Sequence, residues 1–315
     1  MAAEPRYFGR AYRLHFGYKK TSLDFTTSGG PALDIKFNVL YPKGATARFG
    51  DLSILGLDYS TISDFLYLST LGEANAMNEM IHVRLDAGYF SEAGMVNVFD
   101  GFVWYATITQ PPQMWVNLKI NEVNPIRAVA LDNIGKLENM DLRTIVETVL
   151  GHFQTAEGVG FAWLDETQDH IFENDTTKKT IDFGNNLTLD GFIKILNEQA
   201  SPNLTFCMST VGDVAGKRCL VALDKEGKAS PGKITIDSDH GLLSVTGIDA
   251  VNGKITTFID KQAEQPGLPR LELNSILNPE ANGTYLITEQ QYNGHFMGKE
   301  WYVQYKCSGR VSEQQ

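Results

Sequence analysis

The last quarter of the chain contains the stretch that decides the fold. It runs Leu277-Asn278-Pro279, continues with Gly283-Thr284-Tyr285-Leu286-Ile287, and ends with Gly294-His295-Phe296-Met297-Gly298-Lys299-Glu300-Trp301-Tyr302-Val303. Apolar and β-branched runs are interrupted by Asn, Pro and Gly at short intervals, as they are where short strands are joined by turns. The stretch holds no nucleophile beside a base, no cluster of metal ligands and no phosphate-binding loop. It therefore predicts a β-domain and no catalytic centre in this stretch.

The first part of the chain has the same pattern. Residues 33–39 (Leu-Asp-Ile-Lys-Phe-Asn-Val) alternate apolar and polar side chains with the period of two that a strand with one buried face requires. We expect further strands at 52–57, 81–85, 96–108 and 115–120, and a short helix capped by Asp58 or Ser60. Many short strands separated by turn residues favour a barrel or a sandwich over residues 1–125.

The periodicity changes between residues 126 and 232. Two segments, 142–152 and 188–200, place apolar side chains three and four residues apart, which predicts amphipathic helices. Strand-like segments at 159–164, 179–183, 204–209 and 218–223 lie around them, so we expect a compact α+β domain here. The segment 225–233 is rich in Gly, Lys, Ser and Pro and is typical of a linker. A second β-domain is expected over residues 233–315.

Composition places the chain among ordinary globular proteins. It has 315 residues, of which 43% are hydrophobic and 21% charged, so two or three domains with sizeable cores are expected. No run of about 18 apolar residues is present, which predicts no membrane-spanning helix. The first residues, Met-Ala-Ala-Glu-Pro-Arg, lack the apolar segment of a secretory signal, so we expect synthesis and assembly in a cytoplasm.

Cysteine content argues against a disulfide framework or a zinc site, and net charge argues against a nucleic-acid-binding surface. The three cysteines, Cys207, Cys219 and Cys307, are odd in number and have no metal-binding spacing, so reduced, buried thiols are expected. A net charge of −11 argues against a surface dedicated to nucleic acid, because such surfaces neutralise phosphates with Lys and Arg. DNA remains possible as a passenger, since an acidic or neutral wall would let it pass without binding.

Three motifs could be interpreted as chemical sites, but in each the residues are more typical of a structural element. The segment Gly212-Asp213-Val214-Ala215-Gly216-Lys217-Arg218 is one residue too short for a phosphate-binding loop and has Arg where Ser or Thr should hold magnesium. The run Asp237-Ser238-Asp239-His240 offers metal-ligand types but is more typical of a strand end and turn. The adjacent Asp165 and Glu166 would point to opposite faces of a strand, whereas glycosidase carboxylates face each other about 5–10 Å apart.

The remaining candidates are isolated side chains. The six histidines, at positions 15, 82, 152, 170, 240 and 295, form no catalytic or metal-binding spacing, and Asn282-Gly283-Thr284 is interpreted as a turn. The aromatic residues Trp104, Tyr105 and Trp115 could form a sugar-binding platform, but on alternating strands they are expected in the core. The sequence thus predicts no catalytic residue, no cofactor site and no metal site, and a protein that is not an enzyme.

The order and spacing of these segments resemble the baseplate hub proteins of contractile-tailed bacteriophages over most of the chain. The resemblance rests on three short motifs: Leu85-Asp86-Ala87-Gly88-Tyr89, Phe99-Asp100-Gly101 and Gly241-Leu242-Leu243. It also rests on the helical segments 142–153 and 189–200 and on the stretch quoted first. One motif departs from the pattern, because Gly56-Leu57-Asp58 stands where hub proteins usually have an Asn-Leu-Ser-like sequence. This leaves the local turn open.

The resemblance implies two tube-type β-barrels per chain, with an α+β middle domain, assembled as a trimeric ring of pseudo-six-fold symmetry. Such a ring adapts a six-fold tail tube to a three-fold spike and forms part of the genome ejection channel. The implied partners are two further copies of the chain, the tail tube protein, the central spike protein, other baseplate proteins and the tape measure protein. DNA would be present only in transit, and no stable membrane insertion is implied.

The charge balance adds an expectation about the channel, whose wall should be negative or neutral. Acidic residues at strand ends and turns, such as Asp58, Asp86 and Glu280, are the candidates for lining it. Two other functions stay open: a tail-associated carbohydrate-binding β-protein that acts as an adhesin, and a tail-associated glycosidase. An exposed row of aromatic residues would favour the first, and a cleft with two facing carboxylates the second.

Overall fold

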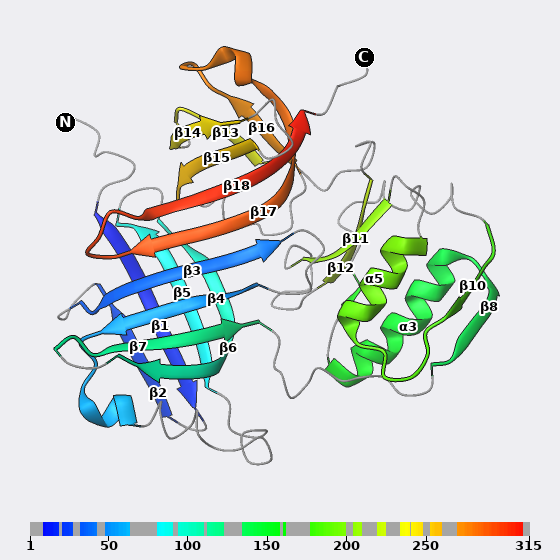
Figure 1. Ribbon diagram of the computed structural model, residues 1–315, viewed down its shortest axis with the longest axis horizontal. Helices are drawn as coiled ribbons and strands as arrows, with labels where there is room; N and C mark the ends of the chain where they lie inside the picture. The colour runs from blue at the N-terminus through cyan, green and yellow to red at the C-terminus, as the bar shows by residue number, and fades with distance from the viewer. Residues whose placement is uncertain are drawn as a thin grey trace.

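The fold of the chain, seen in a computed structural model, is mainly β (Figure 1). The structure describes residues 9–18, 21–27, 32–42, 48–63, 81–90, 94–109, 112–122, 134–157, 160–161, 177–199, 204–209, 219–224, 234–239, 241–247, 253–259 and 270–310. One large sheet and one smaller α+β unit account for these residues. None of the helices in these ranges is long and apolar enough to span a bilayer.

The large sheet takes strands from both ends of the chain. Its N-terminal strands are β1 (Arg10–Tyr18), β2 (Thr21–Thr26), β3 (Asp34–Pro42), β4 (Phe49–Leu55), β5 (His82–Tyr89), β6 (Met95–Ile108) and β7 (Trp115–Asn121). Its C-terminal strands are β13 (Ile234–Asp237), β14 (Leu242–Thr246), β15 (Gly253–Phe258), β16 (Arg270–Asn274), β17 (Gly283–His295) and β18 (Trp301–Arg310). The strand order is β14-β15-β18-β17-β3-β4-β7-β6-β5-β1-β2, with β16 also paired to β17 and β13 to β16.

The two β regions join where β17 pairs with β3, and this pairing is antiparallel. Both strands alternate buried and outward side chains, so their pairing places one apolar face inward and one polar face outward. Opposite Phe37 the partner strand has Gly294, and a Cβ there would come within 2.1 Å of the Phe37 ring. The junction therefore requires glycine at this position.

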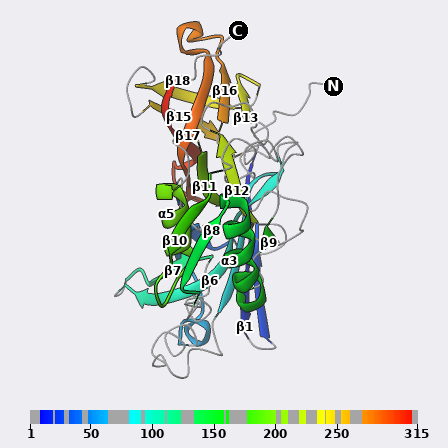
Figure 2. The same cartoon turned by 90° about the vertical axis from the view of Figure 1, so that its right-hand side faces the viewer.

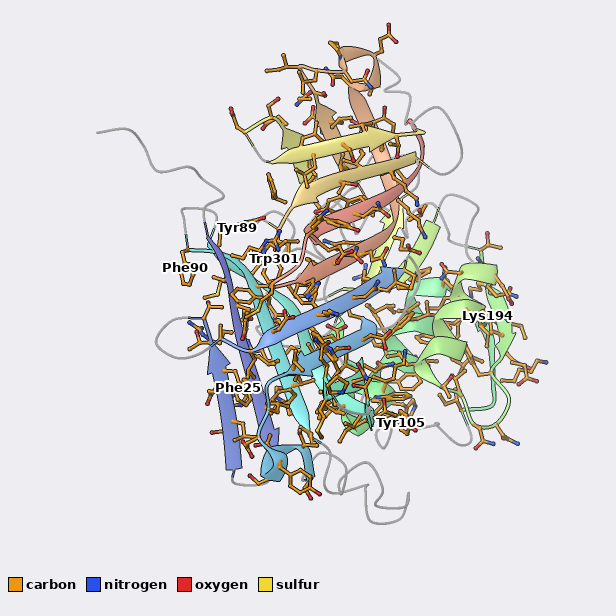
Figure 3. The ribbon with its side chains drawn as sticks, turned by 60° about the vertical axis from the view of Figure 1, so that its left-hand side comes forward. Phe25, Tyr89, Phe90, Tyr105, Lys194 and Trp301 are labelled. Atoms are coloured by element: carbon orange, nitrogen blue, oxygen red, sulfur yellow. The ribbon has the colours of Figure 1, made fainter. Side chains whose placement is uncertain are left out.

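The first β region curls toward the hairpin of β17 and β18. The Arg10 guanidinium donates to the backbone carbonyls of His295 (3.0 Å), Gly298 (2.6 Å) and Lys299 (3.1 Å), and so holds the hairpin turn. The indole N–H of Trp301 donates to the carbonyl of Gly88 on β5 at 3.0 Å. Figure 3 shows Tyr89 and Trp301 close together where the two regions meet.

One hydrophobic core serves both β regions, and it includes residues from both ends of the chain. The rings of Phe37 and Trp301 meet edge to face at 5.3 Å between centroids, and those of Tyr12 and Phe296 at 5.0 Å. Within the described strands the sheet is open and no closed barrel occurs. The mainly β fold class is confirmed, whereas the two separate barrels and the ring remain proposals.

The middle unit has its own core. Its elements are β8 (Lys136–Met140), α3 (Leu142–Glu157), β9 (Gly160–Phe161), β10 (Lys179–Asp182), α5 (Leu189–Gln199), β11 (Leu204–Ser209) and β12 (Cys219–Asp224). Figure 1 shows α3 and α5 side by side, apart from the large sheet. In the side view of Figure 2, β16 and β18 lie at one end of the molecule and the middle unit nearer its centre. The predicted domain limits remain predictions, because residues 123–133 and 225–233 lie outside the described ranges.

Both helices begin at side-chain caps. The carboxylate of Asp141 accepts the N–H of Thr144 at 2.8 Å, and the hydroxyl of Thr188 accepts the N–H of Gly191 at 3.1 Å. The sequence predicted both starts correctly. The first helix runs to Glu157 rather than 152, since the first helix-ending residue after position 152 in the sequence is Gly158.

Candidate functional site

Two of the three sequence motifs lie outside the described part of the chain. These are the segment 212–218 and the pair Asp165 and Glu166. In the third, the Asp237 carboxylate accepts the N–H of Asp239 at 2.8 Å, which is the hydrogen bond of a turn, and His240 lies outside the described residues. Among the residues described, no three His, Cys, Asp or Glu side chains are placed to hold a metal ion.

Histidines in the sheet form pairs with aspartates. His15 contacts Asp24 at 2.7 Å, His82 contacts Asp100 at 2.6 Å and His295 contacts Asp34 at 3.1 Å. Each pair joins two chain segments that lie next to each other in the sheet, so these pairs support strand pairing. His152 is exposed on α3, and His170 and His240 lie outside the described residues.

The thiol of Cys307 is suited to packing rather than chemistry. It is buried in the large core, and burial raises its pKa to about 12. A thiol is nucleophilic as the thiolate, so Cys307 stays protonated and unreactive at neutral pH.

The expectation that Trp104 and Tyr105 belong to the core is wrong. Their side chains are 47% and 56% exposed. Trp104 follows the buried Val103 and faces outward by the ordinary alternation of a strand. Tyr105 faces outward because the pairing of β6 with β7 is irregular between Val103 and Tyr105. A bulge inserts an extra residue and breaks the alternation on which the prediction rested. Trp115 is half-buried, and the ammonium of Lys36 lies 4.0 Å from its ring centroid.

The expectation that Asp86 is an accessible residue lining the channel is also wrong. It is 6% exposed, and its carboxylate accepts from Arg84 (3.2 Å) and from the amide of Asn97 (3.1 Å). The pairing of β5 with β6 is irregular between Leu85 and Asp86 and places Asn97 opposite Asp86, so that Arg84 and Asn97 cover the carboxylate.

The other two acidic candidates are accessible. Asp58 caps a helical turn at 59–63 by accepting the N–H of Thr61 at 2.9 Å, and hydrogen bonds from Ser60 and Thr61 hold its pKa well below the ordinary range. This confirms Asp58 as the predicted cap. Glu280 is exposed in the short 3-10 helix η3 (Pro279–Ala281).

The most distinctive surface is the outward face of β7, β4, β3, β17 and β18, which we name the amide face. It carries these polar side chains: Asn117, Lys119, Asn121, Asp51, Ser53, Asp34, Lys36, Asn38, Glu289, Gln291, Asn293, His295, Glu300, Tyr302, Gln304 and Lys306. One row runs straight across the five strands by register, from Lys119 through Asp51, Asn38 and Asn293 to Tyr302. The face continues across the junction between the two β regions.

Amide side chains on this face bond to one another. The amide N–H₂ of Asn38 donates to the amide oxygen of Asn293 at 3.1 Å, and that of Gln291 donates to the amide oxygen of Asn38 at 3.0 Å. The hydroxyl of Ser53 donates to the amide oxygen of Asn117 at 2.7 Å. These bonds join neighbouring strands across the face.

The charges on the amide face nearly cancel. It has three lysines and four carboxylates: Lys36, Lys119 and Lys306 against Asp34, Asp51, Glu289 and Glu300. Lys119 forms an ion pair with Asp51, Lys306 forms one with Glu289 at 2.5 Å, and Asp34 bonds His295. On a chain of net charge −11, this face is close to neutral.

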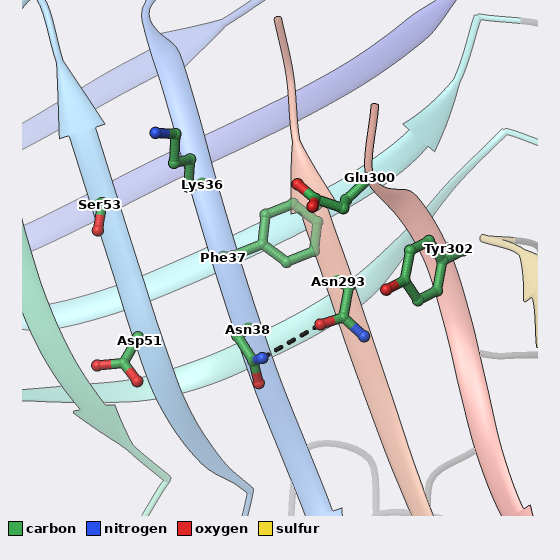
Figure 4. Close-up of a pocket in the computed structure, with 9 residues that line it drawn as sticks. Lys36, Phe37, Asn38, Asp51, Ser53, Asn293, Glu300 and Tyr302 are labelled. Atoms are coloured by element: carbon green, nitrogen blue, oxygen red, sulfur yellow. Dashed lines mark hydrogen bonds between the residues drawn. The ribbon is translucent and has the colours of Figure 1, made fainter. Parts of the chain in front are cut away.

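A shallow groove of about 280 Å³ lies at the centre of the amide face (Figure 4). It is lined by Lys36, Phe37, Asn38, Asp51, Ser53, Asn293, Gly294, Glu300 and Tyr302. Figure 4 shows the polar ends of Asn38, Asn293 and Tyr302 on three adjacent strands. The groove combines amide groups that donate and accept with one cation and two carboxylates.

The sequence patterns did not predict the amide face. The signal was present, because Lys36 and Asn38 alternate with buried residues on β3, as Asp51 and Ser53 do on β4. Which strands lie side by side could not be read from that alternation. The face is visible only once β17 is paired with β3.

Comparison with known proteins rests on structure alone. No protein-family model matches the chain, and no curated protein matches it by sequence. Among solved structures, a 43 kDa tail protein of prophage MuSo2 from Shewanella oneidensis is similar, with a TM-score of 0.55 and 10% identity, covering 94% of this chain and 96% of that one. A tail protein from Neisseria meningitidis MC58 has a TM-score of 0.56 and 10% identity, with coverage of 96% and 97%.

A secretion protein shares the same architecture. The E. coli c3393 protein, a component of the type VI secretion system described as structurally similar to the bacteriophage T4 tail proteins gp27 and gp5, has a TM-score of 0.58 and 9% identity. The match covers 95% of this chain and 77% of that one. The chain therefore has the fold shared by these phage tail and type VI secretion proteins, which confirms at the level of the fold its resemblance to baseplate hub proteins.

Proposed function

We propose that the chain is a structural subunit of a phage tail baseplate hub. The observation that carries this proposal is the fold, which matches two tail proteins along nearly the whole length of both chains. Three copies would form a ring that adapts a six-fold tail tube to a three-fold spike. Because each chain brings two β regions to one continuous sheet, three chains would supply six such units.

The partners follow from that place in the particle. The ring would contact the tail tube protein on one side and the central spike protein on the other, with other baseplate proteins around it and the tape measure protein passing through it. It would reside in the virion tail after assembly in the cytoplasm of the bacterial host. The two barrels would be completed within the assembled ring, because closing a sheet removes its exposed edges.

We place the amide face toward the channel. A trimer would carry three times −11, about −33, and the amide face is nearly neutral within that acidic total. DNA is held by Lys and Arg that are free to neutralise phosphates, whereas two of the three lysines on this face are paired with carboxylates. Such a wall would let DNA pass without binding it.

We propose no enzymatic activity for the chain. Three of the four described histidines pair with aspartates, and Cys307 is a buried thiol with a raised pKa. Any activity that degrades the host wall would belong to a separate spike or lytic protein. Zymography against host murein would show no cleared zone for the purified chain, and a zone abolished by Asp165→Ala or Glu166→Ala would contradict the proposal.

A second candidate function has one observation in its favour. Trp104 and Tyr105 are adjacent and exposed on β6, and exposed aromatic rings can stack on sugars. A carbohydrate-binding role would be supported if Trp104→Ala abolished binding to host surface glycans.

The copy number of the chain in assembled particles tests the hub proposal. Quantitative mass spectrometry of purified tails should give three copies per particle. Two or six copies would rule out the three-fold ring.

A further inference from the structure

The groove at the centre of the amide face has a chemistry that selects among ligands. Asn38 and Asn293 lie directly opposite each other on β3 and β17. Their amides bond to each other and to Gln291, and each keeps at least one N–H and one oxygen lone pair for a ligand. Lys36 and Glu300 add one positive and one negative charge, and no salt bridge joins either to another described residue. A ligand for this groove is therefore polar and close to neutral.

Nucleic acid does not fit this arrangement. A phosphate backbone needs several unpaired cations along its path. The groove has one lysine, and that lysine is accompanied by the carboxylates of Asp51 and Glu300.

A saccharide fits less well than a peptide. Sugars are usually held by stacking on an open aromatic face together with polar hydrogen bonds. Phe37 lines the groove but is buried, and the Lys36 ammonium covers one face of the Trp115 ring at 4.0 Å from the centroid. Tyr302 is partly buried at the opposite border.

We propose that this groove binds an extended, uncharged polar segment of polypeptide from a partner protein. A side-chain amide offers the same donor and acceptor as a peptide group, so Asn38 and Asn293 can pair with the main chain of a bound segment. Same-face side chains recur every two residues on a strand, about 6.8 Å apart. A peptide lying along the strands has the same repeat, so its alternate residues would meet Lys36 and Asn38 on one side of the groove.

The proposal rests on the proposed function only for the source of the peptide, which would be a protein inside the channel. The binding itself is a property of one chain. It is measurable on the purified protein, whereas the three-fold ring is measured in particles. Failure of one therefore does not imply failure of the other.

Fluorescence polarisation with the purified full chain tests the proposal. The probes are three labelled dodecapeptides, (Ser-Gln-Thr-Asn)₃, (Ser-Glu-Thr-Asp)₃ and (Ser-Lys-Thr-Arg)₃, together with labelled maltohexaose and a 12-nucleotide DNA strand. We expect the neutral peptide to bind at least about tenfold more tightly than each other probe, a difference of about 1.4 kcal/mol. Equal or tighter binding of maltohexaose or DNA, or binding of no probe, would overturn the proposal.

Two substitutions localise the binding to the groove. Asn38→Ala and Asn293→Ala should each weaken binding of the neutral peptide about tenfold, because each removes one amide from the groove. Gln304→Ala, on the same face but outside the groove, is the matched control and should leave binding unchanged. All three positions are on the outward face, so circular dichroism should show native folding. Equal losses in all three variants would contradict the assignment.

Discussion

Gly294 shows how a single residue fixes the junction of the two β regions. Its missing side chain leaves room for the ring of Phe37, which packs on Trp301 in the shared core. Gly294 and Phe37 lie opposite each other near the C-terminal end of β17, where β17 pairs with β3 and joins the two β regions. The packing of the two β regions at their junction therefore depends on one glycine.

We predict that Gly294→Ala destabilises the protein by about 1–3 kcal/mol, because the added methyl group overlaps the Phe37 ring. Urea unfolding followed by tryptophan fluorescence measures the loss. The double variant Gly294→Ala with Phe37→Leu should recover part of it. Gly151→Ala is the control: a Cβ there meets nothing within 4 Å in helix α3, so it should be neutral or stabilising. An unchanged midpoint for Gly294→Ala would show that the junction relaxes freely.

At the scale of elements, a buried ion pair ties the ends of β4 and β7. Glu122 accepts from the backbone N–H of Arg48 at 2.6 Å and from its guanidinium, which also donates to the carbonyl of Val98 at 2.9 Å. Burial disfavours the charge on Arg48, but the carboxylate of Glu122 and its hydrogen bond outweigh that effect and raise the pKa of the guanidinium. The cation is therefore compensated only while Glu122 is present.

We predict that Glu122→Ala costs about 3–5 kcal/mol, since it leaves a buried charge without its partner. Asp51→Ala removes the partner of an exposed lysine on the same strands and should cost less than about 1 kcal/mol. Denaturant unfolding of both variants under the same conditions gives the comparison. Equal losses would mean that the buried pair has no special role.

The start of helix α3 predicts a pH dependence. Hydrogen bonds from the backbone and side chain of Thr144 lower the pKa of Asp141. A lowered folded-state pKa means that the carboxylate stabilises the helix above its unfolded pKa of about 3.9, and that this contribution is lost as the pH falls through the folded value. Asp141→Ala should therefore cost about 1 kcal/mol at pH 7, and less below pH 3. Thermal unfolding by circular dichroism at both pH values checks this, and a difference that does not shrink in acid would contradict it.

Sequence patterns predicted the elements better than their arrangement. Alternation along residues 33–39 identified β3, and the spacing of apolar side chains over 142–152 and 188–200 identified both helices. The pairing of β3 with β17 could not be predicted, because it joins residues about 255 positions apart and local patterns do not encode such partners. A bulge placed Tyr105 on the outward face, and hydrogen bonds from Arg84 and Asn97 cover Asp86, which local alternation does not show.

At the scale of the whole molecule, the charge distribution predicts weak binding of DNA. The chain is acidic, and its nearly neutral amide face has most of its lysines paired. Gel-shift experiments at about 50 mM salt, where electrostatic attraction is strong, should show no sub-micromolar affinity. Tight, salt-sensitive binding would mean that the electrostatics of the proposed channel are wrong.

The continuous sheet gives the proposed ring its physical basis. Strands from residues 10–121 and 234–310 share one core, and the outward face continues across their junction, so the two β regions present a single wall. The most direct test is a three-dimensional reconstruction of the assembled tail by electron cryomicroscopy. We predict three copies of the chain between tube and spike, with Asn38 and Asn293 facing the channel axis. A different copy number, or an amide face turned toward the outside of the particle, would contradict the account.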